Sequence, residues 1–546
     1  TFDNTYNNYE GRYILEAGDY YLTVGTDAHV ALNNVLKNQG KEVGDQKVMS
    51  GDAKQVKFTG ENVYKVTLKQ DNEKYLNSTY TGVKITNKLS YGDINLYENR
   101  GENFATYLSR SDWEGTYPER VILTMNSKMK ADLGFEFDYE KTEVFMPLYS
   151  DFKSGSTDGK PDVSKGDLVA YQFIDAPLFP EDAPNQDEEY KDTGRTYAEW
   201  AKLWEQLLNQ MSWEEQAQLC TNGYHQMSEA ESIALPGSKQ ENGPVGITYC
   251  AQFATPDVVA KIRDFVFVGY PCAPILAASF NDEMVERVGR HMSEDMLYTG
   301  YNGIYGPGVN LHRSPYGGRA FEYPSEDPYL AGKIMAAECR GIEYKGALAY
   351  PKHFALNDME TSRMHCGVWS NEQASREIYL RAFEIVFTEG EASATMNSFT
   401  RVGTRWCGAS KELMTDILRG EWGFDGIILT DWDEGKVMNK LDAILAGTNT
   451  FDGNGTLGSY AKWHDDETVA AALRKSSRYL IWNIINTNVM NGTTENTKVY
   501  RVTPWWKKAL YAIDITFGVL TLACAGMTVA SFIISSKNKK HAVTAE

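Results

Sequence analysis

Short apolar runs alternate with longer amphipathic segments along the second half of the chain. The apolar runs have the length of buried strands, and the longer segments repeat their apolar residues at helical spacing. The predicted strands are 275–279, 303–305, 347–350, 393–399 and 426–430, and the predicted helices are 281–299, 329–344, 371–388, 411–421 and 467–489. Alternation over about 250 residues predicts a parallel sheet with helical crossovers, and this length fits a (β/α)8 barrel of the TIM type. A doubly wound sheet is the alternative.

The first 195 residues have a different pattern. Residues 13–25 alternate apolar and polar side chains around Gly18 and Asp19, which predicts two short strands joined by a turn. Two strands cannot bury a core alone, so their partners are expected upstream, in residues outside this chain. Residues 30–195 are polar and predict short strands and linker packed on a larger body. The stretch 181–193 has almost no apolar content and marks a boundary before an amphipathic helix.

An apolar segment near the C-terminal end has the length of a membrane span. Residues 509–534 contain one charged side chain, Asp514, and about 20 apolar residues suffice to cross a bilayer. Trp505 and Trp506 precede this run as interfacial aromatic residues would, and lysines 537, 539 and 540 follow it. The pattern predicts a transmembrane helix, with a buried core helix as the alternative. Lysines and an arginine on both flanks nearly balance, so charge does not decide the orientation.

Composition narrows the class of protein. The 546 residues carry 54 basic and 74 acidic side chains, a net charge of −20, which argues against a general nucleic-acid binder. Such an acidic surface fits an enzyme that acts on neutral molecules such as sugars. The seven cysteines form no CxxC pair or zinc spacing, and no nucleotide-binding glycine motif follows a predicted strand. We therefore expect no metal and no cofactor.

Polar residues follow several of the predicted strands directly. Asp431 follows strand 426–430, and the pair Lys352 and His353 follows strand 347–350. Strand 303–305 leads into a loop that ends at Arg319. Because functional groups of a barrel gather where its strands end, these side chains are expected on one rim. Together they could grip sugar hydroxyls and offer a carboxylate nucleophile.

The order and spacing of these residues resemble the catalytic barrel of glycoside hydrolase family 3, the β-glucosidase-type enzymes. The matching blocks are 242–246, 307–319, 321–328, 352–358 with Arg363, 376–379 and 418–432. The resemblance implies that Asp431 is the catalytic nucleophile. It also implies the residues that hold or line the sugar subsite −1, namely Asn242, Arg319, Lys352, His353, Arg363 and Met396.

The implied chemistry is that of a retaining glycosidase, in which a carboxylate attacks the anomeric carbon and forms a glycosyl-enzyme. Cationic neighbours are expected to keep the carboxylate ionised and to bind hydroxyls more strongly in the transition state. Four positions depart from the family's common residues. They are Asn242 where Asp is common, Thr248 for Arg, Phe399 for Tyr and Thr430 for Ser.

A retaining mechanism needs a second carboxyl group about 5–5.5 Å from the nucleophile. The segment 352–357 resembles the glucosidase branch, in which the acid/base Glu comes from a separate α/β sandwich domain. Glu322 and Glu326 lie near the expected site, but we interpret both as structural. The opening strands resemble the end of a fibronectin-III-like domain. The chain thus resembles the C-terminal part of a circularly permuted member, with its sandwich domain upstream and absent from this sequence.

The expected division follows from these features. The parts are a fibronectin-III-like end (1–45), an accessory region (46–195), the catalytic barrel (196–455), a helix and connector (456–503), a transmembrane helix (504–536) and a cytoplasmic tail (537–546). The expected activity is that of a retaining exo-β-glycosidase, a β-glucosidase that removes terminal non-reducing β-linked glucose from glucosides or oligosaccharides outside the cell membrane. The alternative is a decayed barrel that binds sugar or serves a structural role.

Overall fold

The computed structural model describes most of the chain. The described residues are 1–41, 63–97, 105–107, 126–133, 168–223, 225–248, 268–432, 438–453, 460–493 and 505–543. Much of the predicted accessory region 46–195 lies outside them, as do Arg501 and Cys250. The described chain divides into two compact units, 1–492 and 493–546.

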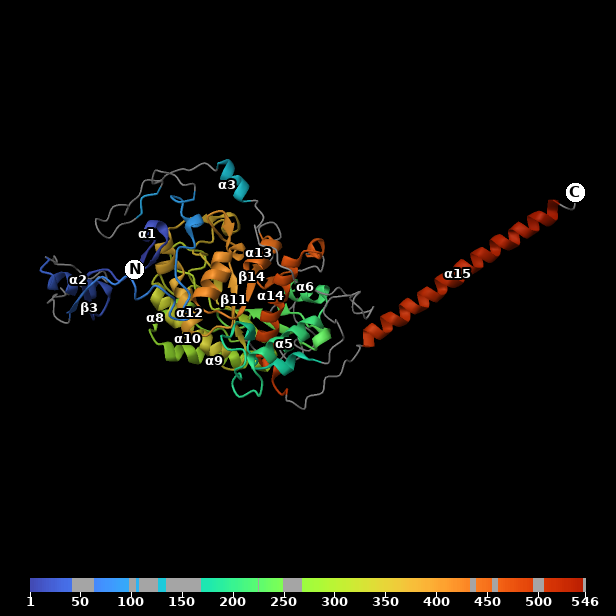
Figure 1. Ribbon diagram of the computed structural model, residues 1–546, viewed down its shortest axis with the longest axis horizontal. Coiled ribbons are helices and arrows are strands. Elements are labelled where there is room, and N and C mark those ends of the chain that lie inside the picture. The colour runs from blue at the N-terminus through green and yellow to red at the C-terminus, as the bar shows by residue number, and fades with distance from the viewer. Residues whose placement is uncertain are drawn as a thin grey trace. The chain divides into compact units, whose positions relative to one another are not determined.

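Two four-stranded sheets form the centre of the first unit (Figure 1). One contains β5 (Gln226–Met227), β6 (Ser238–Asn242), β7 (Gly303–Tyr305) and β8 (Leu348–Ala349), with β6, β7 and β8 parallel. The other has the order β15 (Thr450–Asp452), β14 (Ile427–Trp432), β11 (Ala394–Asn397) and β9 (Lys352–Phe354), all parallel.

Backbone hydrogen bonds continue from one sheet to the other at two places. The amide of Lys352 donates to the carbonyl of Pro307 at 2.9 Å, and the amide of Gly223 donates to the carbonyl of Phe451 at 2.9 Å. The first bond joins the loop after β7 to β9, and the second joins β15 to the segment before β5. The sheets are therefore continuous in hydrogen bonding at both of these edges, while the full eight-stranded (β/α)8 closure remains a prediction.

Helices alternate with the parallel strands, as the apolar pattern predicts. The main ones are α9 (Asp282–Thr299), α10 (Pro328–Glu343), α12 (Arg381–Glu389), α13 (Lys440–Ala446) and α14 (Glu467–Ile485). Figure 1 shows α9, α10 and α12 on the outside of β11 and β14. The predicted helix 371–388 is divided into α11 (Glu372–Ala374), a π-helical turn (Ser375–Tyr379) and α12. The predicted helix 411–421 is a π-helix, Glu412–Glu421.

One strand prediction is wrong. Residues 275–279 lie in a helix, α8 (Ala273–Ala278), and not in a strand. Pro274 occupies the first helical turn, where its fixed φ angle and missing N–H are tolerated. A short apolar run cannot be assigned to helix or strand by periodicity, and the flanking proline and alanines decide in favour of the helix here.

The amphipathic helix predicted after the boundary is α5 (Tyr197–Asn209). Thr196 accepts a hydrogen bond from the amide of Glu199, whose side chain accepts one from the amide of Thr196, so the helix begins with a capping box. The side chains of Trp204 and Leu207, which belong to this helix, are fully buried. Each buried side chain of this size contributes about 1.5–3 kcal/mol relative to exposure, which fixes α5 to the sheet-bearing body.

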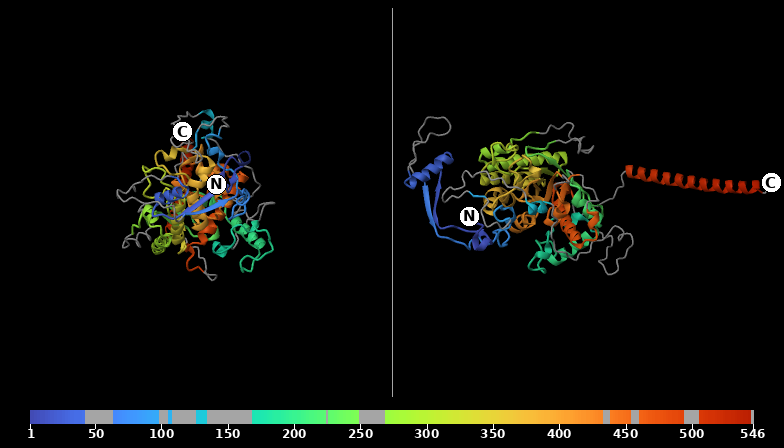
Figure 2. Two further views of the ribbon diagram at one scale, coloured as in Figure 1. Left: turned by 90° about the vertical axis from the view of Figure 1, so that its left-hand side faces the viewer. Right: turned by 90° about the horizontal axis from the view of Figure 1, so that it is seen from above.

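The strands near the start of the chain pair differently from the prediction. Strand β3 (Gly18–Thr23) pairs antiparallel with β4 (Val63–Leu68), and helix α2 (Ala28–Asn38) packs with both (Figure 2). Gly18 begins a strand and is not a turn, and the partner lies downstream instead of outside the chain. Alternation in one segment shows which face is apolar but does not identify the pairing partner.

The remaining short elements lie around this body. They are β1 (Phe2–Asp3), β2 (Arg12–Tyr13), α1 (Tyr6–Tyr9), α3 (Ser127–Asp132), α6 (Trp213–Thr221), β10 (Gly367–Val368), β12 (Arg401–Val402) and β13 (Arg405–Trp406). Strands β10, β12 and β13 form a small sheet from the loops that follow β9 and β11.

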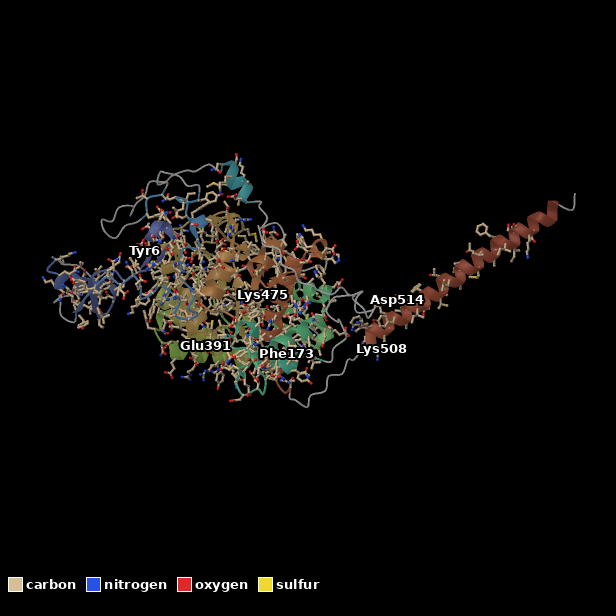
Figure 3. All side chains as sticks on the ribbon, viewed as in Figure 1. Tyr6, Phe173, Glu391, Lys475, Lys508 and Asp514 are labelled. Carbon is tan, nitrogen blue, oxygen red and sulfur yellow. The ribbon has the colours of Figure 1, made fainter. Side chains whose placement is uncertain are left out.

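The second unit contains α15 (Trp505–Val543). Within the described part of the chain, one helix is long and apolar enough to cross a membrane; it covers Trp505–Asn538 and contains an 18-residue window with a mean hydropathy of 2.1. None of that apolar window is buried against protein. Figure 3 labels Lys508 and Asp514 near the start of this helix.

Candidate active site

Asp431 lies at the carboxyl end of β14, the strand in which residues 427–430 are fully buried. Strands β11 and β15 flank β14 on its two sides and fix its direction. The amide of Trp432 donates to Asp431 Oδ1 at 2.7 Å. Asp431 Oδ2 is buried and accepts no hydrogen bond from the described residues. The carboxylate therefore presents one oxygen atom that no donor from the described part of the chain occupies, while its side chain is 15% exposed.

His353, on β9, lies beside this free oxygen. Its Nε2 atom is 3.5 Å from Asp431 Oδ2 and accepts a hydrogen bond from Arg319 at 2.9 Å. Because guanidinium can only donate, Nε2 carries no proton, and Nδ1 donates to the hydroxyl oxygen of Tyr323 at 3.1 Å. Burial, reinforced by Arg319, Lys352 and Arg363, holds the pKa of His353 well below its ordinary value. The imidazole is thus neutral and forms no ion pair with Asp431.

A second carboxylate, Glu322, fixes two of the cationic side chains. Arg319 donates to it through Nε at 2.5 Å and through a terminal nitrogen at 2.7 Å, which is a bidentate pair. Lys352 Nζ lies 3.5 Å from the same carboxylate. Glu322 is only 3% exposed. Its contacts are those of a structural residue, whereas Glu326 is exposed on the surface.

Arg363 approaches the site from the loop after β9. Its guanidinium lies 3.3 Å from Glu360 and stacks over the ring of Phe399 at 4.7 Å. Glu360 also accepts a hydrogen bond from Asn357 at 2.9 Å and lies 3.7 Å from Arg319. Phe399 is buried, so the guanidinium rests on an apolar wall.

Burial and charge act on the pKa of Asp431 in opposite directions. Burial raises this pKa, while Arg363, the Trp432 amide, Lys352 and Arg319 lower it, and the net pKa is above the ordinary value. The cations thus act as expected, but burial outweighs them. A carboxylate that has lost hydration without gaining a donor at Oδ2 is destabilised in its charged form and gains by bonding to an electrophile.

Two hydrogen-bonded crossings hold the loops that carry the site. Asn310, in the loop after β7, accepts from the amide of His353 at 2.7 Å and donates to its carbonyl at 3.2 Å. Asp358, in the loop after β9, accepts from the amide of Leu311 at 2.7 Å. These contacts keep the loops that contain Arg319 and His353 in register.

The structure brings together five of the predicted site residues: Arg319, Lys352, His353, Arg363 and Asp431. Met396 is buried on β11, in register with Lys352 on one side and Leu429 on the other. Asn242 lies at the carboxyl end of β6 with an exposed side chain. Among the described residues, that side chain forms no hydrogen bond with the cluster, so its assignment to the sugar subsite remains a prediction.

Four polar residues of the cluster were missed at the sequence level: Asn310, Tyr323, Asn357 and Glu360. The first three lie inside the blocks that carried the resemblance, and Glu360 lies two residues beyond one of them. Their positions in loops after strands were a usable signal. Their contacts with Arg319 and His353 could not be inferred, because these join segments that meet only in the folded chain.

A further buried carboxyl group lies on the neighbouring strand β15. Asp452 Oδ1 accepts from the amide of His225 at 3.0 Å and from the hydroxyl of Tyr305 at 3.2 Å. Burial raises the pKa of Asp452 to about 6, and the negative charge of Asp431 adds to this effect. Among the described residues, no group of three or more His, Cys, Asp or Glu side chains is arranged to hold a metal ion.

Comparison with known proteins bears on this cluster directly. Residues 258–446 match the model of the Glycosyl hydrolase family 3 N terminal domain, and this range contains every residue from Arg319 to Asp431. Residues 258–446 are thus similar to the glycosyl hydrolase family 3 N-terminal domain. That domain has a TIM-barrel type of fold, in agreement with the alternation of parallel strands and helices described above.

The curated relatives are glycosidases. Over 212 residues the chain is 38% identical to beta-glucosidase A of Butyrivibrio fibrisolvens, a match that covers 39% of this chain and 24% of that protein. It is 36% identical over 239 residues to an exo-alpha-(1->6)-L-arabinopyranosidase of Bifidobacterium longum, covering 42% of this chain and 31% of that protein. These matches therefore span about a quarter to a third of the relatives' length.

A solved beta-glucosidase of Paenibacillus barengoltzii is similar in fold. The similarity covers 92% of this chain and 47% of that chain, with a TM-score of 0.51 and 21% sequence identity. At this identity the likeness concerns the fold alone.

Proposed function

We propose that the protein is a retaining exo-β-glycosidase, a β-glucosidase that removes terminal non-reducing β-linked glucose through a covalent glycosyl–Asp431 intermediate. The observation that carries the proposal is the buried Oδ2 atom of Asp431, which has no donor among the described residues and lies 3.5 Å from a neutral histidine. The match of residues 258–446 to the family model and the glucosidase relatives support the same activity.

In the proposed reaction, Asp431 Oδ2 attacks the anomeric carbon, and the bond from that carbon to the leaving oxygen breaks. Lys352 and Arg319 offer N–H donors to the sugar hydroxyls, which orient the anomeric carbon toward Asp431. The Nε2 atom of the neutral His353 already accepts a hydrogen bond from Arg319, so a sugar hydroxyl that donates to Nε2 shares this acceptor with Arg319. His353 thus orients the sugar and gives no proton to Asp431. Water then attacks the same carbon and releases glucose and the carboxylate.

The leaving oxygen needs a proton from a second carboxyl group. Glu322 and Glu360 both lie in ion pairs with Arg319, which suits neither of them to this role. We assign the acid/base Glu to an upstream α/β sandwich domain of a circularly permuted protein, in keeping with the resemblance to the glucosidase branch. General acid catalysis is worth about 10²–10⁴-fold, so this chain alone is expected to be weak or inactive on unactivated glucosides.

The remaining parts of the proposal concern location and domain division. We propose that α15 anchors the protein in the cell membrane, with the active site outside the cell and the tail 537–546 inside. We also propose the domain boundaries that the sequence pattern predicts. The length and apolar composition of Trp505–Asn538 support an anchor. Deletion of residues 504–546 should move the protein from the membrane fraction to the soluble fraction. Unchanged membrane association of the truncated protein would contradict the anchor.

The activity is tested by Asp431→Asn in the complete protein, upstream domains included. Loss of turnover by about 10⁴-fold or more is expected, because the covalent route is removed. The matched control is Glu391→Gln, an exposed carboxylate at the amino end of β11 that Figure 3 labels. Turnover by Asp431→Asn at the wild-type level would show that the nucleophile is assigned wrongly.

A second candidate function is a barrel that binds sugar without turning it over. The substitutions Asn242, Thr248 and Phe399 at positions where the family commonly has other residues favour it. It predicts sugar binding without release of an aryl leaving group, even with the upstream domain present. A burst of aryl release would exclude it, and a panel of β-glucosides and α-L-arabinopyranosides would then separate the two activities named among the relatives.

A further inference from the structure

We propose that Glu360 is a positioning residue of this site, which holds the guanidinium groups of Arg319 and Arg363 together beside Asp431 and limits the positive charge that they impose on it. This inference deepens the proposed function and rests on it for its catalytic meaning. The charge arrangement itself is a property of the folded chain and can be measured without turnover.

The two oxygen atoms of Glu360 serve different partners. Oε1 lies 3.7 Å from a terminal nitrogen of Arg319 and accepts from Asn357 at 2.9 Å, while Oε2 lies 3.3 Å from a terminal nitrogen of Arg363. The other edge of Arg319 is already occupied by Glu322. The nitrogen that faces Glu360 is therefore the same one that donates to His353.

The backbone around Glu360 is built for this role. The amide of Arg363 donates to the carbonyl of Glu360 at 3.2 Å, which places the two side chains one turn apart. A Cβ atom added at Gly318 would lie 3.2 Å from the Cβ of Glu360, so the loop that carries Arg319 packs closely on the stem of this glutamate. Glu360 thus contacts both of the loops that supply the arginines.

A chain of hydrogen bonds also connects Glu360 to His353. Asn357 donates to Glu360 and to the hydroxyl oxygen of Tyr323, both at 2.9 Å, and Tyr323 contacts Nδ1 of His353 at 3.1 Å. Displacement of Glu360 would therefore disturb the arginines on one side and the tautomer of His353 on the other.

The charges in the site give the direction in which the pKa of Asp431 should move when Glu360 loses its charge. Three cations, Arg319, Lys352 and Arg363, face three carboxylates, Glu322, Glu360 and Asp431. The cations lower the pKa of Asp431, and Glu360 partly cancels the field of two of them. Without its charge the site has one uncompensated positive charge, which lowers the pKa of Asp431 further.

The test is Glu360→Gln in the complete protein, which keeps the shape and removes the charge. Water-soluble carbodiimide labels protonated carboxyl groups, so mass spectrometry of Asp431 labelling against pH reports its titration in the free protein. We expect the midpoint to fall by roughly half a pH unit or more, and the acid limb of kcat/KM to move in the same direction. Glu326→Gln, an exposed carboxylate in the loop after β7, is the control and should leave both unchanged.

A second variant tests the same charge balance if Glu360→Gln does not fold. In Glu360→Gln/Arg363→Gln a positive charge that acts directly on Asp431 is removed together with the negative one, so the labelling midpoint should rise to the wild-type value or above it. An unchanged or raised midpoint in Glu360→Gln, or a double variant with a lowered midpoint, would overturn the role of Glu360. If the midpoint shifts as expected but the wild-type protein neither turns over glucosides nor forms an adduct, the proposed function fails and the positioning role stands.

Discussion

The buried ion cluster around Arg376 gives a stability prediction that can be worked from the structure. Arg376 is 3% exposed and donates to Glu372 at 2.8 Å and to the two oxygens of Glu421 at 2.6 and 3.0 Å. It also donates to the carbonyl of Thr86 at 3.1 Å. This one side chain therefore ties Thr86 to α11 and to the π-helix Glu412–Glu421.

Arg376→Met keeps the bulk of the side chain and removes its charge. Glu372 retains the amides of Lys88 and Leu89 at 2.8 and 2.7 Å, but Glu421 loses both of its arginine contacts while it is buried. Removing one partner of a buried pair costs about 3–5 kcal/mol, because an uncompensated charge remains.

The assay is urea unfolding at pH 7, followed by tryptophan fluorescence. Arg381→Met is the matched control, because Arg381 is 36% exposed and pairs with Glu384 at 2.8 Å. An exposed pair of this kind contributes about 0–1 kcal/mol. If Arg376→Met loses no more stability than Arg381→Met at pH 7, the reasoning from burial and pairing is refuted.

Three further predictions concern groups near the strands. Asp431→Asn should increase the free energy of unfolding at pH 7 by about 1 kcal/mol, because it removes a buried negative charge whose Oδ2 has no donor among the described residues, and a decrease would contradict this. Burial raises the pKa of Glu343 to about 7, so the stability that it contributes is present below about pH 4.5 and lost as pH rises through 7. Glu343→Gln should flatten the fall in stability between pH 5 and 8 by roughly 2 kcal/mol, and an unchanged slope would refute the assignment. Asn310→Ala should lower kcat by about tenfold at unchanged secondary structure by circular dichroism, since both backbone hydrogen bonds to His353 are lost, and wild-type kcat would contradict that role.

Local patterns predicted the parts of the fold in which the signal is local. Strand β7 and strand β14 are compact apolar runs followed by polar residues, and both are strands in the structure. The apolar run at 275–279 has the same appearance but is helical, because Pro274 starts a helix there. The pairing of β3 with β4 depends on a contact over more than forty residues, which alternation within one segment does not encode.

The residues of the candidate site also divide into those that the local sequence predicted and those that it did not. Asp431, Lys352 and His353 could be selected because they follow the predicted strands 426–430 and 347–350, although the structure places them within β14 and β9. The role of Glu360 could not be selected, because its partners come from the loops after two different strands. The direction of the pKa shift of Asp431 could not be predicted from the sequence either, because burial raises this pKa more than the three cations lower it.

The measurement that tests the central claim most directly is mass spectrometry of the protein after incubation with a 2-deoxy-2-fluoro-β-glucoside that bears an activated leaving group. The leaving group needs no acid catalysis, so the reaction tests the nucleophile and the sugar subsite alone. The account predicts one fluoroglucosyl group on the peptide that contains Asp431, and none on Asp431→Asn. No adduct at Asp431, either with this chain or with the upstream domains restored, would contradict it.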